Sequence, residues 1–207
     1  MHIRPFQPGD ESALAHICLV TADAGEDATG QLPDDALWGD LFVLPYVARH
    51  PDCAWVVDAG DGEDGTPGTP IGYIVGAPDT AAFEAWFGEV WWPSRGWEKP
   101  GEAEPGAEQS TVDGLLRYGF SRNADAPGIN DAEYPAHLHI DLLPHTQGQG
   151  FGRALIQTLL GRFRDLGLPG VHLEASPRNT GALAFYPRVG FTALPAAEDT
   201  RRFGQKL

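Results

Sequence analysis

The chain of 207 residues is long enough for one domain with a sizeable core, whereas two domains would each be small. It has 29 acidic and 14 basic side chains, and a formal net charge of −15 argues against a nucleic acid as partner. The two cysteines give neither a disulfide framework nor a paired metal-ligand spacing, and no apolar segment approaches the roughly 20 residues that span a bilayer. We therefore expect one cytoplasmic domain over residues 1–207, without a metal or a membrane attachment.

The first 77 residues predict three strands and two helices, and the second and third strands form a hairpin. Pro8-Gly9-Asp10 reads as a turn in which Asp10 is the N-cap of a helix. Apolar residues at helical spacing predict a second helix, which ends before His50-Pro51. The expected elements are a strand over 2–6, helices over 10–20 and 34–46, and strands over 53–59 and 71–77 that form a hairpin with a long loop.

The region over residues 78–135 breaks this regular pattern and predicts an insertion that contains helices. Its aromatic side chains crowd together, and residues 99–106 are typical of an exposed linker. Exposed aromatic clusters tend to mark binding surfaces, so the insertion forms either a wall of a substrate pocket or a local core. The aromatic residues concerned are Phe83, Trp86, Phe87, Trp91, Trp92 and Trp97.

Regular order returns at residue 136 with the pattern of a βαβ unit followed by a helix and a strand. The expected elements are a strand over 136–143, a loop over 144–149, a helix over 150–166, a strand over 171–175, a helix over 179–189 and a last strand near Phe191. The glycine-rich segment lies directly before the first of these helices.

The glycine-rich segment Gln147 to Gly152 has the composition of an anion site at a helix N-terminus. The free N–H groups there carry partial positive charge, and glycines let a pyrophosphate approach the backbone. A P-loop would need Gly-Lys followed by Ser or Thr, but the chain has Gly152-Arg153-Ala154. A dinucleotide fingerprint remains as an alternative, because Glu174 stands near the end of the next strand, although Arg153 occupies its third glycine position.

The order of elements and two motifs together resemble the GNAT superfamily of N-acetyltransferases. Gln147, Gly150 and Gly152 match its Q/R-x-x-G-x-G/A motif. The second motif, N-x-x-A-x-x-L-Y-x-x-x-G-F, is matched from Asn179 to Phe191, with Phe185 in place of the usual Leu. The chain is also similar to the acetyltransferase-like C-terminal domain of O-GlcNAcases, as a stand-alone bacterial-type homologue.

The resemblance implies an α/β (α+β) fold with a central mixed, twisted sheet of about six to seven strands and an acetyl-CoA-binding core over 136–191. It implies that the backbone of Leu142 and Leu143 pairs with the pantetheine arm, that Asn179 contacts that arm, and that Tyr186 lies near the thioester sulfur. Asn179 also suits a helix N-cap, and Tyr186 a core aromatic. The pyrophosphate would be held by Gln147, Gly148, Gln149, Gly150, Phe151, Gly152 and Arg153.

Acetyl transfer to an amine needs a proton donor for the departing thiolate and an acceptor for the amine proton. Tyr186 is the candidate acid. Alternation along a strand puts His137, His139 and Asp141 on one face, where His139 and Asp141 could relay the amine proton or form only a wet, ion-paired face. Glu174 is a further candidate base, with a structural ion pair as the alternative.

Three functions stay open at this stage. The first is direct, acetyl-CoA-dependent N-acetylation of an amine acceptor, either a small molecule or a peptide, since neither cysteine lies in the motifs. The second is a module that binds acetyl-CoA or a peptide without turnover, and the third is a dinucleotide-binding protein. The acceptor stays open, as does the oligomeric state, a homodimer included.

Overall fold

The chain folds around one seven-stranded sheet with the strand order β1-β2-β3-β4-β5-β7-β6. The structure, a computed structural model, describes residues 1–60, 68–101, 111–123 and 131–207. All neighbouring strands are antiparallel except β4 and β5, which are parallel. The strands are β1 (His2–Pro5), β2 (Ala54–Asp58), β3 (Pro70–Ala77), β4 (Ala136–Leu142), β5 (Gly170–Ala175), β6 (Thr192–Leu194) and β7 (Arg201–Lys206). This mixed sheet confirms the predicted fold class and differs from the doubly wound parallel sheet of dinucleotide-binding proteins.

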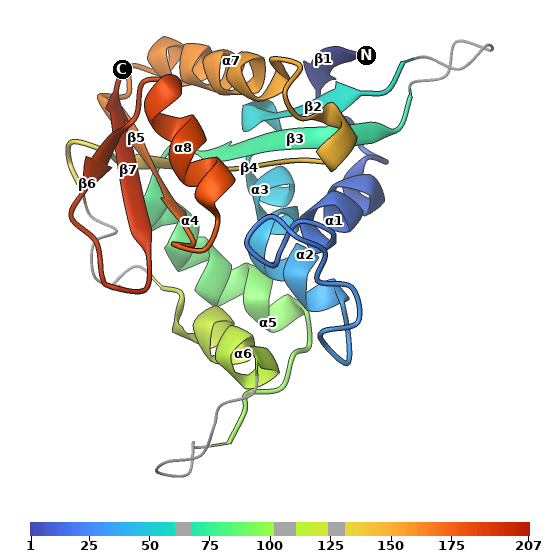
Figure 1. Ribbon diagram of the computed structural model, residues 1–207. Helices are drawn as coiled ribbons and strands as arrows, with labels where there is room; N and C mark the ends of the chain where they lie inside the picture. The colour runs from blue at the N-terminus through green and yellow to red at the C-terminus, as the bar shows by residue number, and fades with distance from the viewer. Residues whose placement is uncertain (61–67, 102–110, 124–130) are drawn as a thin grey trace.

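Helices cover both faces of the sheet (Figure 1). Within the described part of the chain, no helix is long and apolar enough to cross a membrane. The α-helices are α1 (Glu11–Leu19), α2 (Ala36–Phe42), α3 (Leu44–Arg49), α4 (Thr80–Trp86), α5 (Trp92–Ser94), α6 (Thr111–Ser121), α7 (Phe151–Asp165) and α8 (Thr180–Arg188). Three further turns are the 3₁₀ segments η1 (Pro51–Cys53) and η3 (Pro144–Thr146) and the π-helical segment η2 (Phe87–Trp91).

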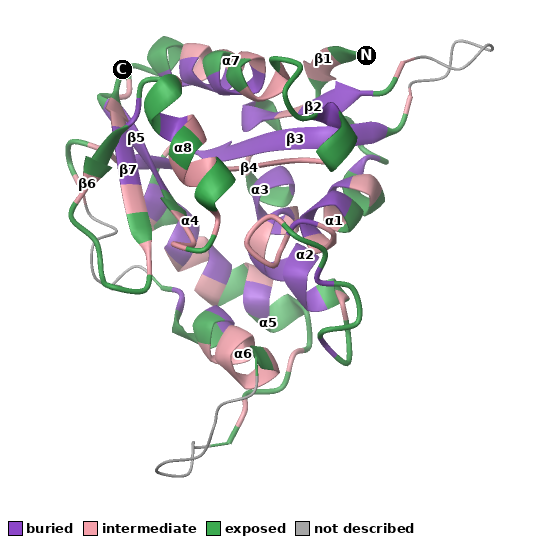
Figure 2. Ribbon diagram, in the orientation of Figure 1, coloured by how far each residue is buried: buried purple, intermediate pink, exposed green. Residues whose placement is uncertain are grey.

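Two apolar cores lie on opposite faces of the sheet, because successive side chains of a strand point to opposite sides. Tyr73 and Val75 of β3 join the core beneath α1 to α5, whereas Ile74 joins the core beneath α7 and α8. β3 is buried along its whole length between them (Figure 2). A Cβ at Gly76 would lie 2.7 Å from Cζ of Phe163, so glycine is what lets α7 approach β3 this closely.

The single helix expected over residues 34–46 is wrong: two helices, α2 and α3, replace it. The break falls at Val43, whose φ is −132°. Pro45 has no N–H, so it cannot bond the carbonyl of Leu41 as a continuous helix requires. That carbonyl instead accepts a hydrogen bond of 2.7 Å from Arg122.

β7 is the element that the sequence pattern did not indicate. It pairs with β5 on one side and with β6 on the other, so the chain returns from β6 into the middle of the sheet. Its sequence, RRFGQK, is mostly polar and contains a glycine, which is atypical of a strand with two neighbours. Its pairing with β5 and β6, rather than local propensity, therefore makes this segment a strand.

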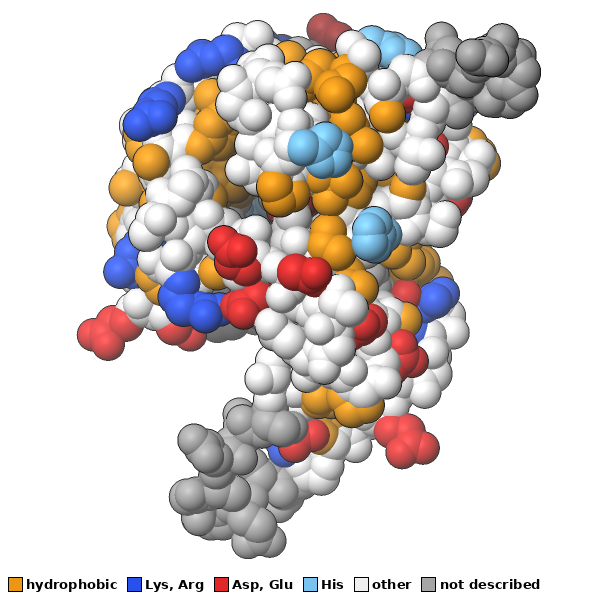
Figure 3. Space-filling model, turned by 45° about the vertical axis from the view of Figure 1, so that its right-hand side comes forward, with side chains coloured by type: hydrophobic (Ala, Val, Ile, Leu, Met, Phe, Trp, Pro, Cys, Tyr) orange, Lys and Arg blue, Asp and Glu red, His pale blue; other side chains and the backbone are white. Residues whose placement is uncertain are grey.

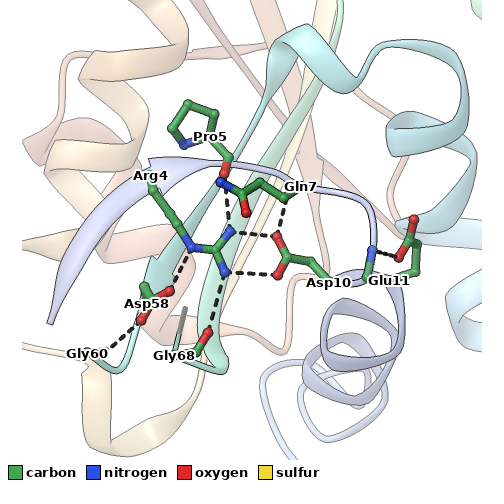
Figure 4. A network of polar contacts seen from close by, with 9 residues as sticks. Arg4, Pro5, Gln7, Asp10, Glu11, Asp58, Gly60 and Gly68 are labelled. Carbon is green, nitrogen blue, oxygen red and sulfur yellow. Dashed lines mark hydrogen bonds and ion pairs between the residues drawn. The ribbon is translucent and has the colours of Figure 1, made fainter. Parts of the chain in front are cut away.

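A polar network around Arg4 joins β1, β2 and the start of α1 (Figure 4). Asp10 precedes α1 as predicted, but its carboxylate makes no cap bond and instead binds Arg4 at 2.7 and 2.9 Å and the N–H of Gln7 at 2.9 Å. Arg4 also donates to the fully buried Asp58 at 2.6 Å. Burial works against the charged form of Asp58, but the hydrogen bonds from Arg4 and the N–H of Gly60 lower its pKa overall.

The described part of the 78–135 insertion is helical and forms a local core. Trp92 is 2% exposed, and the other indoles of the segment pack against the core beneath α1 to α5. The indole N–H groups of Trp91 and Trp97 donate to the backbone and the carboxylate of Asp40 in α2, at 2.8 and 2.9 Å. Of the two predicted roles, the local core is the one these contacts support.

Candidate functional site

The parallel strands β4 and β5 separate soon after they begin. They share only the pairs Ala136↔Val171 and His137↔His172, whereas β4 stays paired with β3 from His137 to Leu142. Beyond His137, the edge of β4 that faces β5 therefore has no strand partner among the described residues. A wedge opens in the sheet at this point, and extended ligands can bind to strand edges through main-chain hydrogen bonds.

The register of β3 and β4 shows which backbone groups face the wedge. Leu143 N–H donates to the carbonyl of Ile71 at 3.0 Å, and hydrogen-bonded pairs alternate with non-bonded pairs along an antiparallel ladder. The pair Gly72↔Leu142 is consequently non-bonded, and the N–H of Leu142 points away from β3 into the wedge. The N–H of Leu142 is thus available to a ligand, as predicted. The N–H of Leu143 is not, because it already donates to the carbonyl of Ile71.

The glycine segment forms an open cradle at the N-terminus of α7. Gly148 and Gly150 have φ of +74° and +87°, a region that glycine adopts without strain, and a Cβ added at either would meet nothing within 4 Å. In the described part of the chain, no side chain makes a cap hydrogen bond at this end of the helix. Gln147 closes the loop by donating to the carbonyl of Leu142 at 3.0 Å, and Gln149 does so by donating to that of His145 at 2.6 Å. The first N–H groups of a 15-residue helix are therefore presented outward.

A single cavity of about 740 Å³ connects the wedge and the cradle. Basic side chains lie at the cradle, where Arg153 donates to the carbonyl of Arg188 at 2.8 Å and ties α7 to α8. Gln149, Phe151 and Leu143 are not among its lining residues. The predicted site residues that line it are Asp141, Leu142, Gln147, Gly148, Gly150, Gly152, Arg153, Asn179 and Tyr186.

Residues 21–26, between α1 and α2, form a wall of this cavity that the sequence did not indicate. An ion pair between Asp23 and Arg178 holds this loop to the turn after β5. Asn179 caps α8 by accepting from the N–H of Ala182 at 2.9 Å, and a Cβ at Gly25 would lie 3.3 Å from the Asn179 amide nitrogen. No motif marks the loop, and only the tertiary structure brings it to Asn179.

Tyr186 lies in α8 between the cavity and the core. Its ring packs against Phe185, Phe191 and Phe203, and the residue is 7% exposed. Burial raises the pKa of Tyr186, and the nearby Asp141 carboxylate raises it further. The phenol is therefore neutral. Tyr186 is a core aromatic that also lines the cavity, and its role as the acid stays a prediction.

The polar face of β4 divides into two parts. His137 is buried, approaches the Thr80 hydroxyl at 2.9 Å and packs edge-on to Phe83, so it is part of the interior. Asp141 lines the cavity, whereas His139 is not among the lining residues and lies behind Asp141, with 3.6 Å between its Nε2 and the Asp141 carboxylate. Burial raises the pKa of Asp141, against the hydrogen bonds and the histidine that lower it.

Glu174 lies apart from the other candidates. It is exposed on β5 and is not among the residues that line the cavity. Among the described residues, no group of three or more His, Cys, Asp or Glu side chains is arranged to hold a metal ion. In Figure 3, acidic side chains gather in the middle of the molecular face, next to basic ones. The lining of the cavity is also mixed in charge, despite the net charge of −15: it includes Asp23, Glu26, Asp141, Arg153, Arg178 and Arg188.

Comparison with known proteins agrees with this geometry. The model of the acetyltransferase (GNAT) family matches residues 116–191. A mycothiol acetyltransferase of Nocardiopsis dassonvillei is 39% identical over 70 residues, which are 33% of this chain and 21% of that protein. The O-GlcNAcase of Rattus norvegicus is 23% identical over 188 residues, which are 91% of this chain and 20% of that protein. The chain thus spans about a fifth of the length of these curated relatives.

Solved structures extend the likeness to the whole chain. The crystal structure of SsHAT has a TM-score of 0.83 and 34% sequence identity, and the match covers 99% of this chain and 97% of SsHAT. A GNAT superfamily phosphinothricin acetyltransferase from Sinorhizobium meliloti, solved with AcCoA, shares the fold at a TM-score of 0.54 and 15% identity, over 100% of this chain and 88% of that one. With its open wedge between β4 and β5 and its glycine cradle at α7, the chain belongs to the GNAT family of acetyltransferases.

Proposed function

We propose that the chain is an acetyl-CoA-dependent N-acetyltransferase that passes acetyl directly to an amine. The observation that carries this proposal is the single cavity that joins the uncapped start of α7 to Tyr186 and Asp141. A dinucleotide site would need the doubly wound sheet that the strand order does not have.

The cavity has a suitable group for each part of the donor. The outward N–H groups from Gly148 to Gly152, with Arg153 beside them, suit the pyrophosphate. The N–H of Leu142 suits a pantetheine amide, or the thioester carbonyl whose charge grows during the reaction. A Cβ built on Gly150 would meet no atom within 4 Å, so the space beside this backbone is open to a ligand.

The chemistry follows from the neighbours of the wedge. The amine nitrogen forms a bond to the thioester carbon, the carbon–sulfur bond breaks, and Tyr186 donates its proton to the departing thiolate. The amine proton passes to the polar pair of Asp141 and His139. A covalent cysteine intermediate is disfavoured, because Cys18 and Cys53 are buried and do not line the cavity. Burial raises the pKa of the Cys53 thiol to about 11.

Donor binding is tested by calorimetric titration with acetyl-CoA, CoA and NAD. We expect acetyl-CoA and CoA to bind and NAD not to bind. Binding of NAD without binding of acetyl-CoA would reject the proposal. Release of CoA in the presence of a panel of amines then separates an enzyme from a module that only binds: donor binding with no amine-dependent CoA release would favour the module.

The role of Tyr186 is tested by Tyr186→Phe, which removes the phenol proton and keeps the ring. We expect kcat to fall at least about 100-fold, as for the loss of a general acid, and Kd for acetyl-CoA to stay within about twofold. Tyr134→Phe, which alters a tyrosine outside the cavity, is the control. Equal kcat for Tyr186→Phe and the unmodified protein would remove Tyr186 from the mechanism.

A further inference from the structure

Tyr73 lies beneath the polar pair of Asp141 and His139, on the neighbouring strand. It is opposite Asp141 in the register of β3 and β4, and its side chain is fully buried. Its hydroxyl is 2.6 Å from Oδ2 of Asp141 and 3.2 Å from Nδ1 of His139. Tyr73 lies outside the two GNAT motifs, which run from Gln147 to Gly152 and from Asn179 to Phe191.

The direction of these hydrogen bonds determines where the protons lie. Burial and the Asp141 carboxylate raise the pKa of Tyr73 well above its usual value, so the phenol keeps its single proton. The 2.6 Å contact has the length of a hydroxyl donating to a carboxylate. With its proton directed to Asp141, the Tyr73 oxygen is left as an acceptor, and a hydrogen bond at the 3.2 Å contact then requires the His139 proton to be on Nδ1. The lone pair of His139 is left on Nε2.

The groups around this arrangement come from several elements. Cys18 of α1 donates to the carbonyl of Trp38, and burial raises the pKa of its thiol, so it contributes no charge. His137 of β4 is also neutral, because burial and the neighbouring His172 lower its pKa. Tyr186 of α8 is neutral as described above, and Phe42 of α2 packs on the His139 ring at 6.1 Å. Asp141 is consequently the only charged side chain that touches the Tyr73–His139 pair among these groups.

We propose that Tyr73 is a positioning residue that holds His139 in the Nδ1–H tautomer and so makes Nε2 the acceptor of the amine proton. This rests on the proposed acetyl transfer. As the new C–N bond forms, the amine proton passes to Nε2, and the resulting imidazolium lies 3.6 Å from the Asp141 carboxylate, which stabilises its charge. Tyr186 supplies the proton that the thiolate takes, and it regains one from solvent as His139 gives its proton up.

The first test measures the tautomer and needs no activity. In long-range ¹⁵N NMR of ¹⁵N-histidine-labelled protein, the His139 signals are identified as those that disappear in His139→Gln. We expect Nδ1–H in the unmodified protein and a shift toward Nε2–H in Tyr73→Phe, with no change in Tyr46→Phe, another buried tyrosine of the same core. An Nε2–H tautomer in the unmodified protein, or an unchanged tautomer in Tyr73→Phe, would overturn the proposal.

The second test separates positioning from a purely structural role. The hydrogen bond from Tyr73 lowers the pKa of Asp141, so this pKa rises when Tyr73→Phe removes the bond. Asp141 then loses the charge that stabilises the His139 imidazolium at a higher pH, and the acid limb of the kcat profile moves to higher pH. We expect kcat at neutral pH to fall about tenfold or more while Kd for acetyl-CoA is unchanged. A uniform loss of kcat with the profile unmoved would refute positioning. Absence of transfer to any amine in the unmodified protein would refute the proposed function instead, and the NMR result would still decide the tautomer.

Discussion

Gly150 shows how one backbone conformation prepares the candidate donor site. Its φ of +87° turns the chain from the loop into α7, so the first N–H groups of the helix face the cavity. Any residue with a Cβ is strained at this angle, even though the space around Gly150 is empty. The glycine is therefore required by its angle and not by crowding.

Gly150→Ala tests this requirement. We expect a loss of stability of about 1 kcal/mol, from the cost of a left-handed alanine, and weaker binding of acetyl-CoA because the cradle relaxes away from φ +87°. Thermal unfolding and calorimetry provide the two measurements. Gly161→Ala, in the same helix and also with empty space around it, is the matched control and should stabilise α7 by up to about 1 kcal/mol. Unchanged acetyl-CoA affinity in Gly150→Ala would show that the cradle does not contact the donor.

At the scale of elements, Arg122 holds α6 against α2 and α4. Its guanidinium binds both carboxylate oxygens of Glu84 at 2.8 and 2.6 Å and the carbonyl of Leu41 at 2.7 Å, and it lies 3.7 Å above the centre of the Phe87 ring. Both charges are buried, so each depends on the other for compensation. The same contact satisfies the carbonyl that the break between α2 and α3 leaves free.

Arg122→Met should destabilise the protein strongly, by about 3–5 kcal/mol, because it leaves the Glu84 carboxylate buried without its partner. The double variant with Glu84→Gln should recover part of this loss. Chemical denaturation measures both free energies of unfolding. Arg162→Met removes an exposed ion pair with Asp52 and serves as the control, for which we expect little change. Equal stability of Arg122→Met and Arg162→Met would contradict the role of the buried pair.

At the scale of the whole molecule, buried histidines make stability depend on pH. Burial lowers the pKa of His172 and, more strongly, that of His137, and neighbouring positive charges add to the effect. The unfolded chain takes up protons at these sites as the pH falls through about 6.5, whereas the folded chain does so only at lower pH. Their contribution to stability is thus complete above about pH 6.5 and is lost as the pH falls through the folded pKa.

We therefore expect the free energy of unfolding to fall between about pH 7 and pH 5, by up to about 1.4 kcal/mol per pH unit for each histidine. Urea denaturation at several pH values measures this slope. His137→Asn, whose amide can still bond the Thr80 hydroxyl, should reduce the slope even if it lowers stability at pH 7. The same change at the exposed His145 is the control. An unaltered slope in His137→Asn would show that His137 titrates alike in both states.

The sequence alone was sufficient for the elements whose signals are local. The glycine segment, the helix after it and the second motif from Asn179 to Phe191 indicated the family, and alternation along β4 correctly put His139 and Asp141 on one face. Positive φ, helix capping and strand alternation depend on residues that are neighbours in the chain, so they can be predicted from one sequence.

Only the tertiary structure decided which of these residues meet. The pairing of β7 inside the sheet, the hydrogen bond from Arg122 to the Leu41 carbonyl, and the contact of Tyr73 with Asp141 all join residues far apart in the chain. The family resemblance assigned the backbone of Leu143 to the donor together with that of Leu142, but the register with β3 gives the Leu143 N–H to Ile71. Register and long-range contacts follow from how whole faces pack, which no local pattern encodes.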